Sequence, residues 1–164
     1  MKEYWEEILG EYQCGFRPQR RTMDQIFIVR QILEKCYAHD IDLQLLLIDF
    51  KKAFDSVNQK KLLESLVSFG IPKKIERFVK MTLEGAQAKV IVDGKISTPF
   101  GIRVSTGVRQ GDGLSATLFN LVLHKALKNL EQNNTILNRL TQICGYATDI
   151  LVTARSLPAL EAMC

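Results

Sequence analysis

Two aspartates near the middle of the chain, Asp49 and Asp55, are the residues whose type and position most plainly suggest chemistry. Asp49 directly follows the apolar run at residues 45–48, which is predicted to be a buried strand. A carboxylate at the end of such a strand is fixed in place and partly dehydrated, which suits a divalent cation. Asp49 could instead simply end the strand, while Asp55 helps to begin the next helix. The residue types alone leave both interpretations open.

A second candidate is the loop at residues 106–115, where Gly107, Gly111 and Gly113 separate polar residues ahead of an expected helix. Glycines let a loop backbone approach a ligand closely, and free amides at the start of a helix can bind phosphate. Because glycine-rich loops before helices are common, a purely structural loop is the favoured interpretation of this pattern by itself.

A third candidate is Asp149, which follows the dipeptide Ala147-Thr148 between two apolar segments. An acidic residue beside a tight turn is ordinary turn chemistry, so Asp149 alone does not indicate a site. Any chemistry at these three features therefore depends on the elements that position them.

The elements around these residues are expected to alternate between helices and strands. Thr22 and Gln25 form a capping-box pattern that predicts the start of a helix, and the apolar residues after it share one helix face. The run at residues 43–48 predicts a strand buried on both faces. Further helices are expected at residues 58–69, 72–83 and 115–130, with Ser115 as the cap of the last one.

Two hairpins are expected in the second half of the chain. Asp93-Gly94 predicts a tight turn that joins strands at residues 89–92 and 95–103. Segments 142–146 and 149–153 flank the turn at Ala147-Thr148 in the same way. Strands interleaved with helices and followed by hairpins predict an α+β fold, with a mainly antiparallel sheet and helices packed on one face.

The composition is typical of one folded domain. The chain has 164 residues, of which 46% are apolar and 24% charged, and this excludes intrinsic disorder. No apolar run approaches the roughly 18 residues that a transmembrane helix needs, and the charged N-terminus does not resemble a signal peptide. We therefore expect an intracellular protein, nuclear or cytoplasmic and not secreted. The net charge of +4 is compatible with a phosphate-bearing partner but does not require one.

The cysteines and histidines are too scattered to predict a zinc site, a disulfide framework or a catalytic histidine. We expect reduced cysteines and structural or surface histidines. These residues are Cys14, Cys36, Cys144, Cys164, His39 and His124.

In their order and spacing, these features resemble the reverse transcriptases of non-LTR (LINE-like) retrotransposons. The first block reads Tyr-Gln-Cys-Gly-Phe-Arg from Tyr12, and the second reads Ile-Asp-Phe-Lys-Lys-Ala-Phe-Asp from Ile48. The third begins Gly-Val-Arg-Gln-Gly-Asp at Gly107, and the fourth is the hairpin at Tyr146, where the family has Tyr-Ala-Asp-Asp. The blocks lie at residues 12–25, 48–55, 107–120 and 146–149.

The resemblance implies a polymerase palm and part of the fingers, without a thumb, in a truncated reverse transcriptase domain. Residues 1–42 would belong to the fingers side, and residues 43–164 would form the palm. Such an enzyme is an RNA-directed DNA polymerase that uses two Mg²⁺ ions. Its expected partners are an RNA template, a DNA primer and a deoxynucleoside triphosphate, with no membrane.

The resemblance also assigns roles to particular residues. Asp49 would bind both metal ions, and the backbone carbonyl of Phe50 would be a further ligand. Phe54 would be the steric gate that rejects a ribose 2′-hydroxyl. The expected nucleotide-binding residues are Phe50, Lys51, Lys52, Ala53, Phe54, Gln110 and Gly111. The expected template and primer contacts are Arg17, Arg20, Arg21, Arg109 and Tyr146, and their binding would be salt-sensitive.

One departure from the family concerns the catalytic hairpin. The position of its essential carboxylate is occupied by Thr148, a neutral residue, so weaker metal binding and impaired activity are expected. Asp149 is a candidate catalytic carboxylate, but strand alternation predicts that its side chain points away from the site. The alternative is a non-catalytic retrotransposon remnant that at most binds nucleic acid.

Overall fold

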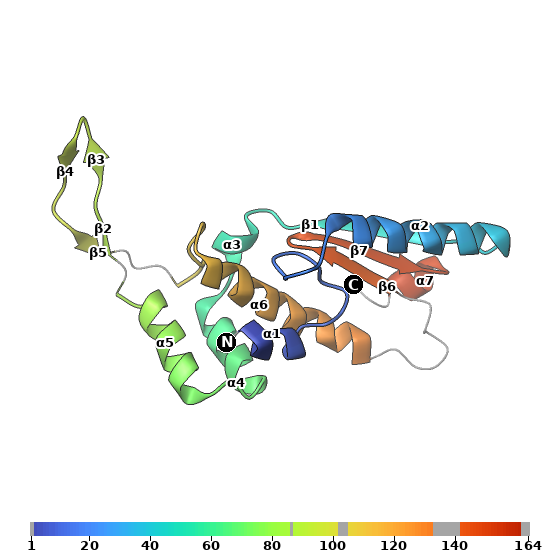
Figure 1. The fold of residues 1–164 in the computed structure, drawn as a ribbon, viewed down its shortest axis with the longest axis horizontal. Coiled ribbons are helices and arrows are strands. Elements are labelled where there is room, and N and C mark those ends of the chain that lie inside the picture. The colour runs from blue at the N-terminus through green and yellow to red at the C-terminus, as the bar shows by residue number, and fades with distance from the viewer. Residues whose placement is uncertain (1, 86, 102–104, 133–141, 162–164) are drawn as a thin grey trace. The chain divides into compact units, whose positions relative to one another are not determined.

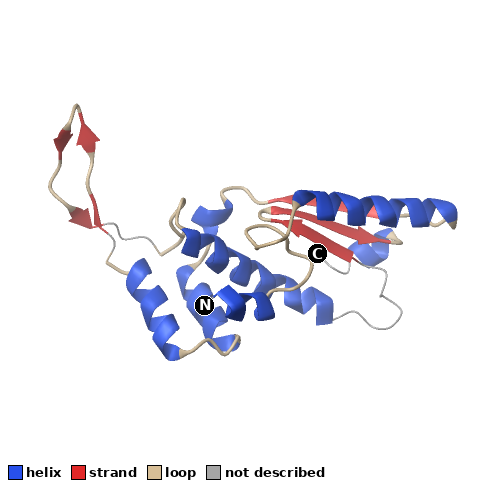
Figure 2. Cartoon of the chain, in the orientation of Figure 1, coloured by secondary structure: helices blue, strands red, loops and turns tan. Residues whose placement is uncertain are grey.

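The computed structural model describes residues 2–85, 87–101, 105–132 and 142–161. The chain forms two compact units, which we call the sheet unit (residues 1–53 and 123–164) and the helical unit (residues 54–122). Figure 2 shows helices in both units. The three-stranded sheet belongs to the sheet unit, and two two-stranded sheets belong to the helical unit.

The sheet unit is built on an antiparallel sheet of three strands, β1 (Gln44–Asp49), β6 (Gln142–Tyr146) and β7 (Asp149–Ala154), in the order β1-β7-β6 (Figure 1). Next to β6, a short bridge pairs Gln13 with Gly145 in parallel. In this bridge the Cys14 amide donates to the Gly145 carbonyl, and the Gly145 amide donates to the Tyr12 carbonyl, both at 2.8 Å. The structure confirms the predicted strand and hairpin.

The two faces of this sheet differ in burial. Ile150, Val152 and Ala154 point to one face and are at most 3% exposed. The opposite face includes Leu47, whose side chain is 81% exposed. The prediction that this strand is buried on both faces is therefore wrong. The reason is that β1 lies at the edge of an antiparallel sheet, and the described residues leave one face of β1 open at Leu47.

Helix α2 (Thr22–Ala38) precedes β1 and runs alongside the sheet in Figure 1. The helix begins as predicted, but its cap is different. Arg21 is the N-cap residue, and its backbone amide donates to Asp24 Oδ2 at 2.8 Å. Gln25 does not close a capping box, because its side chain is buried and donates to the Tyr12 carbonyl at 3.1 Å.

Two short helices complete the sheet unit. Helix α1 (Lys2–Ile8) lies at the N-terminus, and α7 (Leu157–Glu161) follows β7 and packs against β7 and β1. Trp5 of α1 and Leu160 of α7 are buried. Both helices thus add apolar side chains to the core of the unit.

The helical unit contains α4 (Gln59–Ser68) and α5 (Lys73–Leu83), which pack against each other after the short α3 (Ala53–Ser56). The Asn58 side chain caps α4 by accepting from the Lys61 amide at 3.0 Å. Gly70, with φ of 71°, supplies the left-handed residue that follows α4. Leu62, Leu66 and Val79 are completely buried. Both predicted helices are confirmed.

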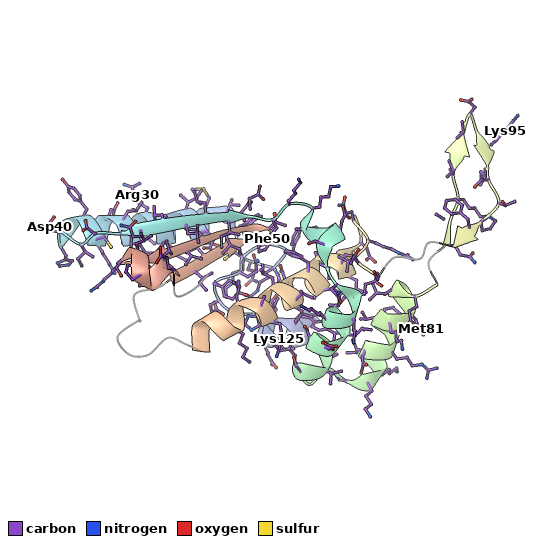
Figure 3. All side chains as sticks on the ribbon, turned by 180° about the vertical axis from the view of Figure 1, so that it is seen from behind. Arg30, Asp40, Phe50, Met81, Lys95 and Lys125 are labelled. Carbon is purple, nitrogen blue, oxygen red and sulfur yellow. The ribbon has the colours of Figure 1, made fainter. Side chains whose placement is uncertain are left out.

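A ribbon of short strands follows α5: β2 (Gln87–Ala88), β3 (Ile91–Val92), β4 (Lys95–Ile96) and β5 (Phe100–Gly101). Ile91 pairs with Ile96 across the predicted two-residue turn at Asp93-Gly94, so this hairpin is confirmed. Figure 3 shows Lys95 projecting from it. The expected second strand extended to residue 103, but residues 102–104 lie outside the described part of the chain.

Helix α6 (Gly113–Gln132) begins before the predicted start. Asp112 Oδ1 accepts from the Leu114 amide at 3.0 Å, while Ser115 is buried inside the first turn. The prediction of Ser115 as the cap is therefore wrong, because the carboxylate of Asp112 accepts from the first free amide, that of Leu114. Among the described residues, no helix is long and apolar enough to cross a membrane.

Candidate functional site

The carboxylates of Asp49 and Asp149 belong to directly paired residues. Asp49 ends β1, Asp149 begins β7, and the antiparallel register places them opposite each other. Directly opposite residues project from the same face of a sheet, with β-carbons about 5 Å apart. Both residues are exposed, and Tyr146 pairs with Asp149 from the other side. The sheet thus gathers two carboxylates and one aromatic ring at the open end of one face.

The expectation that Asp149 points away from the site is wrong. Alternation of side chains applies along a strand, and Thr148 lies in the turn rather than in β7. Asp149 is the first residue of the strand, and the pairing with Asp49 fixes its direction. The one-residue shift from Thr148 therefore does not carry Asp149 to the far face of the sheet.

The donor set at this end of the sheet suits a divalent cation only in part. Mg²⁺ is commonly bound through one or two carboxylates together with substrate phosphates, and Asp49 and Asp149 supply such a pair. Figure 3 labels Phe50 immediately after β1, where its carbonyl oxygen could add a further ligand. Thr148, in the turn, contributes no charge. No group of three or more metal-ligating side chains is found among the described residues.

The turn between the two strands is held by a residue that sequence reasoning missed. Gln13 is 1% exposed, and its side-chain amide bonds to both the backbone N–H and the carbonyl of Ala147. Gln13 lies inside the first family block, but neither its spacing nor its polarity distinguished it from a surface residue. Its burial depends on the bridge beside β6, which connects segments that are far apart in the sequence.

A cavity of about 490 Å³ lies between α2 and the face of the sheet that bears the two aspartates. Its walls are mainly apolar. Cys144, on this wall, is buried, and burial raises the pKa of its thiol. The side chains that line the cavity include Ile26, Val29, Leu33, Leu47, Leu151 and Tyr146.

Of the arginines predicted to contact a template, Arg17 has an internal role. Its side chain is 2% exposed and pairs with Glu6 at 2.8 Å, while Nη1 donates to the carbonyls of Gly10 and Gln13. A guanidinium enclosed in this way does not reach a phosphate backbone. Arg20 is partly exposed and paired with Glu11, and that pairing raises the pKa of Arg20. Arg21 is exposed.

His124, a histidine expected to be structural, is buried in the sheet unit against Tyr12. The Tyr12 hydroxyl lies 3.2 Å from Nδ1 of His124, and the two rings stack with centroids 5.8 Å apart. Burial lowers the pKa of His124, and the positive charges of Lys128 and Arg17 lower it further. The neutral imidazole is therefore the form that this packing favours.

The helical unit holds a second set of predicted residues. Phe54 stacks on Phe119 of α6, with ring centroids 5.1 Å apart. The Phe54 carbonyl accepts from the Val108 amide at 3.0 Å, and the Val57 carbonyl accepts from the Gly107 amide at 2.7 Å. These bonds attach the glycine-rich loop to the segment after Ala53. They thereby connect the third family block to the end of the second.

The same loop brings Gln110 to Asp55. Gln110 Nε2 lies 3.5 Å from Asp55 Oδ1, and both residues are exposed. Gly111 has a φ of 84°, a backbone conformation that favours glycine. Arg109 is also exposed. Asp55 was considered from the sequence as a residue that helps to begin a helix, and its contact with Gln110 adds a second role.

The remaining predicted residues lie between β1 and α3. Lys51 and Lys52 are exposed, Phe50 is 37% exposed, and Ala53 is buried. Lys52 has a φ of 53°, which marks a tight turn at this point. The structure therefore presents the predicted site residues in two sets, one in each unit.

Comparison with known proteins agrees with these blocks. A family profile described as reverse transcriptase (RNA-dependent DNA polymerase) matches residues 1–164. The Pol polyprotein of the type-2 retrotransposable element R2DM from Drosophila melanogaster is 31% identical over 153 residues, which are 92% of this chain and 14% of that protein. A probable RNA-directed DNA polymerase from the X-element transposon of the same organism is 31% identical over 91% of this chain and 16% of its own length.

Solved structures with the same fold include two telomerases. An apo telomerase from Candida tropicalis, truncated from its C-terminal domain, superposes with a TM-score of 0.72 over 92% of this chain and 31% of that chain, at 14% identity. A telomerase from Candida albicans in complex with a fragment of telomeric RNA gives a TM-score of 0.59 over 98% of this chain and 29% of that chain, at 11% identity. These likenesses confirm the predicted α+β palm fold. With its full length matched by the family profile, the chain belongs to the reverse transcriptase family, as a domain of the kind found in non-LTR retrotransposons.

Proposed function

We propose that this chain is the centre of an RNA-directed DNA polymerase, which copies RNA into DNA by template-directed transfer of deoxynucleotides. The observation that supports this most strongly is the register that sets Asp49 directly opposite Asp149 at the open end of the sheet. Family membership supplies the class of reaction. The two carboxylates supply the charge that this reaction needs at its centre.

The site would act by position and charge, because phosphoryl transfer asks the protein mainly for orientation and neutralisation. Asp49, Asp149 and the carbonyl of Phe50 would hold the divalent ions. When bound, such ions activate the attacking hydroxyl of the primer and neutralise charge on the leaving pyrophosphate. Paired strands make the carboxylates rigid, so little reorganisation would be needed during the reaction.

Residues of the second and third blocks would bind the incoming nucleotide. Lys51 and Lys52 are exposed cations beside a tight turn, which suits a triphosphate. Phe54 would exclude a ribose 2′-hydroxyl, and its stacking on Phe119 would keep the ring from moving aside. Gln110, which contacts Asp55, and Gly111 would line the nucleotide and template pocket.

The template and primer would meet exposed basic and aromatic side chains. Arg20, Arg21 and Arg109 can contribute charge to a phosphate backbone, with a strong dependence on salt. Tyr146 is 38% exposed and can stack on a base or sugar. Arg17 is left out of this set because its side chain is enclosed.

Thr148 would limit this activity. With threonine in place of the family carboxylate, the site holds two negative charges where three are expected, so the affinity for the second cation should fall. The decisive experiment is Mg²⁺-dependent primer extension on an RNA template, comparing the natural chain with Thr148→Asp. We expect weak incorporation that rises by about 100-fold or more in Thr148→Asp, the size typical for recovery of one catalytic electrostatic contact.

The matched control is Asp49→Asn in the Thr148→Asp chain, which keeps the fold and removes the first carboxylate. It should abolish the recovered incorporation. If folded Thr148→Asp still incorporates nothing, the polymerase proposal for this chain is overturned.

Thr148 also favours a second candidate function, a non-catalytic remnant that binds nucleic acid. This candidate predicts RNA binding that weakens steeply with salt and that is lost when Arg20, Arg21 and Arg109 are changed to alanine. It predicts no incorporation by Thr148→Asp. Fluorescence anisotropy with a labelled RNA at several salt concentrations distinguishes it from both an active polymerase and an inert fragment.

A further inference from the structure

We propose that Gln13 is a positioning residue for the catalytic hairpin, and that its buried amide sets the turn at Ala147-Thr148 and thereby the approach of Asp149 to Asp49. This inference rests on the proposed function, since it concerns the divalent-cation site of that function. Its evidence is the hydrogen-bond network around the turn, which lies entirely within the sheet unit.

The amide of Gln13 meets both backbone polar groups of one turn residue. Nε2 donates to the Ala147 carbonyl at 3.0 Å, and Oε1 accepts from the Ala147 amide at 2.8 Å. Oε1 also accepts from the Gly15 amide at 2.8 Å. Because Gln13 is 1% exposed, water does not compete for these bonds. A carboxamide is the side-chain group that can donate and accept at once in this geometry.

The turn needs this support because Ala147 does not favour the conformation that it adopts there. Ala147 has a φ of 57°, a left-handed conformation that is unfavourable for a residue with a β-carbon. Turns of this kind usually have Gly, Asn or Asp at such a position. Two hydrogen bonds from one rigidly held amide offset that cost. They also stabilise one of the conformations that are available to a two-residue loop.

Gln13 is itself held in place from several directions. The backbone on both sides of Gln13 pairs with Gly145 of β6. The Gln13 carbonyl accepts from Arg17 Nη1 at 3.0 Å, and Arg17 is fixed by Glu6 and by the Gly10 carbonyl. The enclosed ion pair of Arg17 therefore contributes to this network, because it anchors the loop from which the Gln13 side chain reaches the turn.

The fit between the two segments is close as well as polar. A β-carbon on Gly15 would overlap the backbone nitrogen of Ala147 and lie 2.5 Å from its Cα. Asp149 follows Ala147 by two residues and starts the strand opposite Asp49. A displacement of the turn is thus transmitted directly to the first residue of β7, which is the carboxylate that the site uses.

The test compares Gln13→Met, which keeps the length of the side chain and removes both polar atoms, with the natural chain. The first readout is hydrogen exchange of the Ala147 amide by NMR, in the absence of metal. We expect its protection to fall by roughly tenfold, as for lost buried hydrogen bonds, while Ile150 and Val152 keep theirs. The second readout is the affinity for Mn²⁺, measured from line broadening at Asp49 and Asp149, which should fall several-fold.

Gln25→Met is the matched control. Gln25 is also a buried glutamine of the sheet unit, but its Nε2 donates to the Tyr12 carbonyl and contacts the sulfur of Cys14 rather than the turn. A merely structural role of a buried amide predicts equal effects from the two variants. Positioning predicts that only Gln13→Met changes Ala147 exchange and the Mn²⁺ affinity.

A second variant covers the case in which Gln13→Met does not fold. Gln13→Glu keeps an acceptor for the Ala147 and Gly15 amides, but its carboxylate lacks the donor and faces the Ala147 carbonyl, so the protection of the Ala147 amide should again fall. Unchanged Ala147 exchange and unchanged Mn²⁺ affinity in a folded Gln13 variant would overturn the inference. If the natural chain binds no Mn²⁺ but Ala147 exchange responds as expected, the proposed function fails while the support of the turn stands.

Discussion

Two hairpins in the described part of the chain have two-residue turns, and they are stabilised in different ways. The turn at Asp93-Gly94 uses residues that readily adopt positive φ, at 50° and 74°, and nothing lies within 4 Å of a β-carbon placed on Gly94. The turn at Ala147-Thr148 uses residues that do not favour such a conformation, and Gln13 and Gly15 pack directly on it. The first turn is determined locally, whereas the second is determined by a distant segment of the chain.

The proposed function offers a reason for this difference. The hairpin at Asp93-Gly94 is flanked by exposed side chains, among them Ile91, Val92 and Ile96. The turn at Ala147-Thr148 precedes Asp149. The proposed reaction depends on the position of Asp149 opposite Asp49. A turn fixed by tertiary bonds can hold a carboxylate in one position, because its shape does not depend on the conformational freedom of its own residues.

Gly15→Ala should give the largest effect, because it breaks the support of the catalytic turn directly. The added β-carbon would overlap the backbone of Ala147, which cannot move aside as a flexible side chain could. We expect a loss of about 3 kcal/mol in the free energy of unfolding, measured by urea denaturation.

Gly101→Ala is the control for this prediction. A β-carbon on Gly101 meets nothing within 4 Å, so its effect should stay within about 0.5 kcal/mol. Equal stability of Gly15→Ala and Gly101→Ala would show that the segment at Gly15 does not rest on the turn.

A smaller effect is expected when the two turns exchange residue types. Gly94→Ala places a β-carbon on a residue with φ of 74°, without any clash, and should cost the isolated hairpin about 1 kcal/mol. The population of the Ile91–Ile96 pairing, followed by NMR, measures this loss.

Ala147→Gly is the reciprocal change and should have the opposite sign. It relieves the left-handed strain at φ of 57° and should stabilise the chain by up to about 1 kcal/mol, reduced by the added flexibility of the unfolded state. A destabilising effect would mean that Ala147 is not strained, and the contrast between the turns would lose its basis.

Several parts of the fold and site could be predicted from the sequence because their signals are local. Asp93-Gly94 marks its own turn, and the helix capped by Asn58 has an amphipathic pattern with a glycine at its end. Asp49 follows an apolar run, so its place at the end of a strand was also predictable. The order of the four blocks indicated the family, which the full-length profile match confirmed.

The errors arose where distant segments decide the outcome. Asp149 was expected to face away from the site because side chains alternate along a strand. This was wrong because pairing with β1 decides where the turn ends and β7 begins. Arg17 was predicted to be a template contact, because nothing in the sequence shows that Glu6 and two carbonyls surround it. Gln13 was missed for the same reason. A polar residue that is buried by tertiary pairing has no periodic pattern, so composition and spacing cannot distinguish it from a surface residue.

The smallest expected effect is a dependence of stability on pH, which should differ between the two hairpins. His124 packs on Tyr12, whose carbonyl accepts from the amide of Gly145 in β6, and burial lowers the pKa of this imidazole below its usual value of 6.5. The unfolded chain therefore binds a proton at His124 at a higher pH than the folded chain does. Stability should be unaffected above pH 6.5 and should decline as the pH falls from 6.5 toward the lowered value.

The measurement is hydrogen exchange, corrected for its intrinsic pH dependence, at the Gly145 and Ala147 amides and at the hairpin of Ile91 and Ile96. Protection at the first two amides should decrease as the pH falls from about 6.5 to about 5.5, since the unfolded chain binds a proton at His124 more readily than the folded chain in that range. His124→Gln keeps an acceptor for the Tyr12 hydroxyl and removes the titration, so this decrease should vanish. A decrease that persists in His124→Gln, or that appears equally at Ile91 and Ile96, would show that the catalytic turn does not depend on the neutral imidazole. If the decrease is confined to the Gly145 and Ala147 amides, the contacts that support their hairpin extend from Gln13 through Tyr12 to His124 of α6.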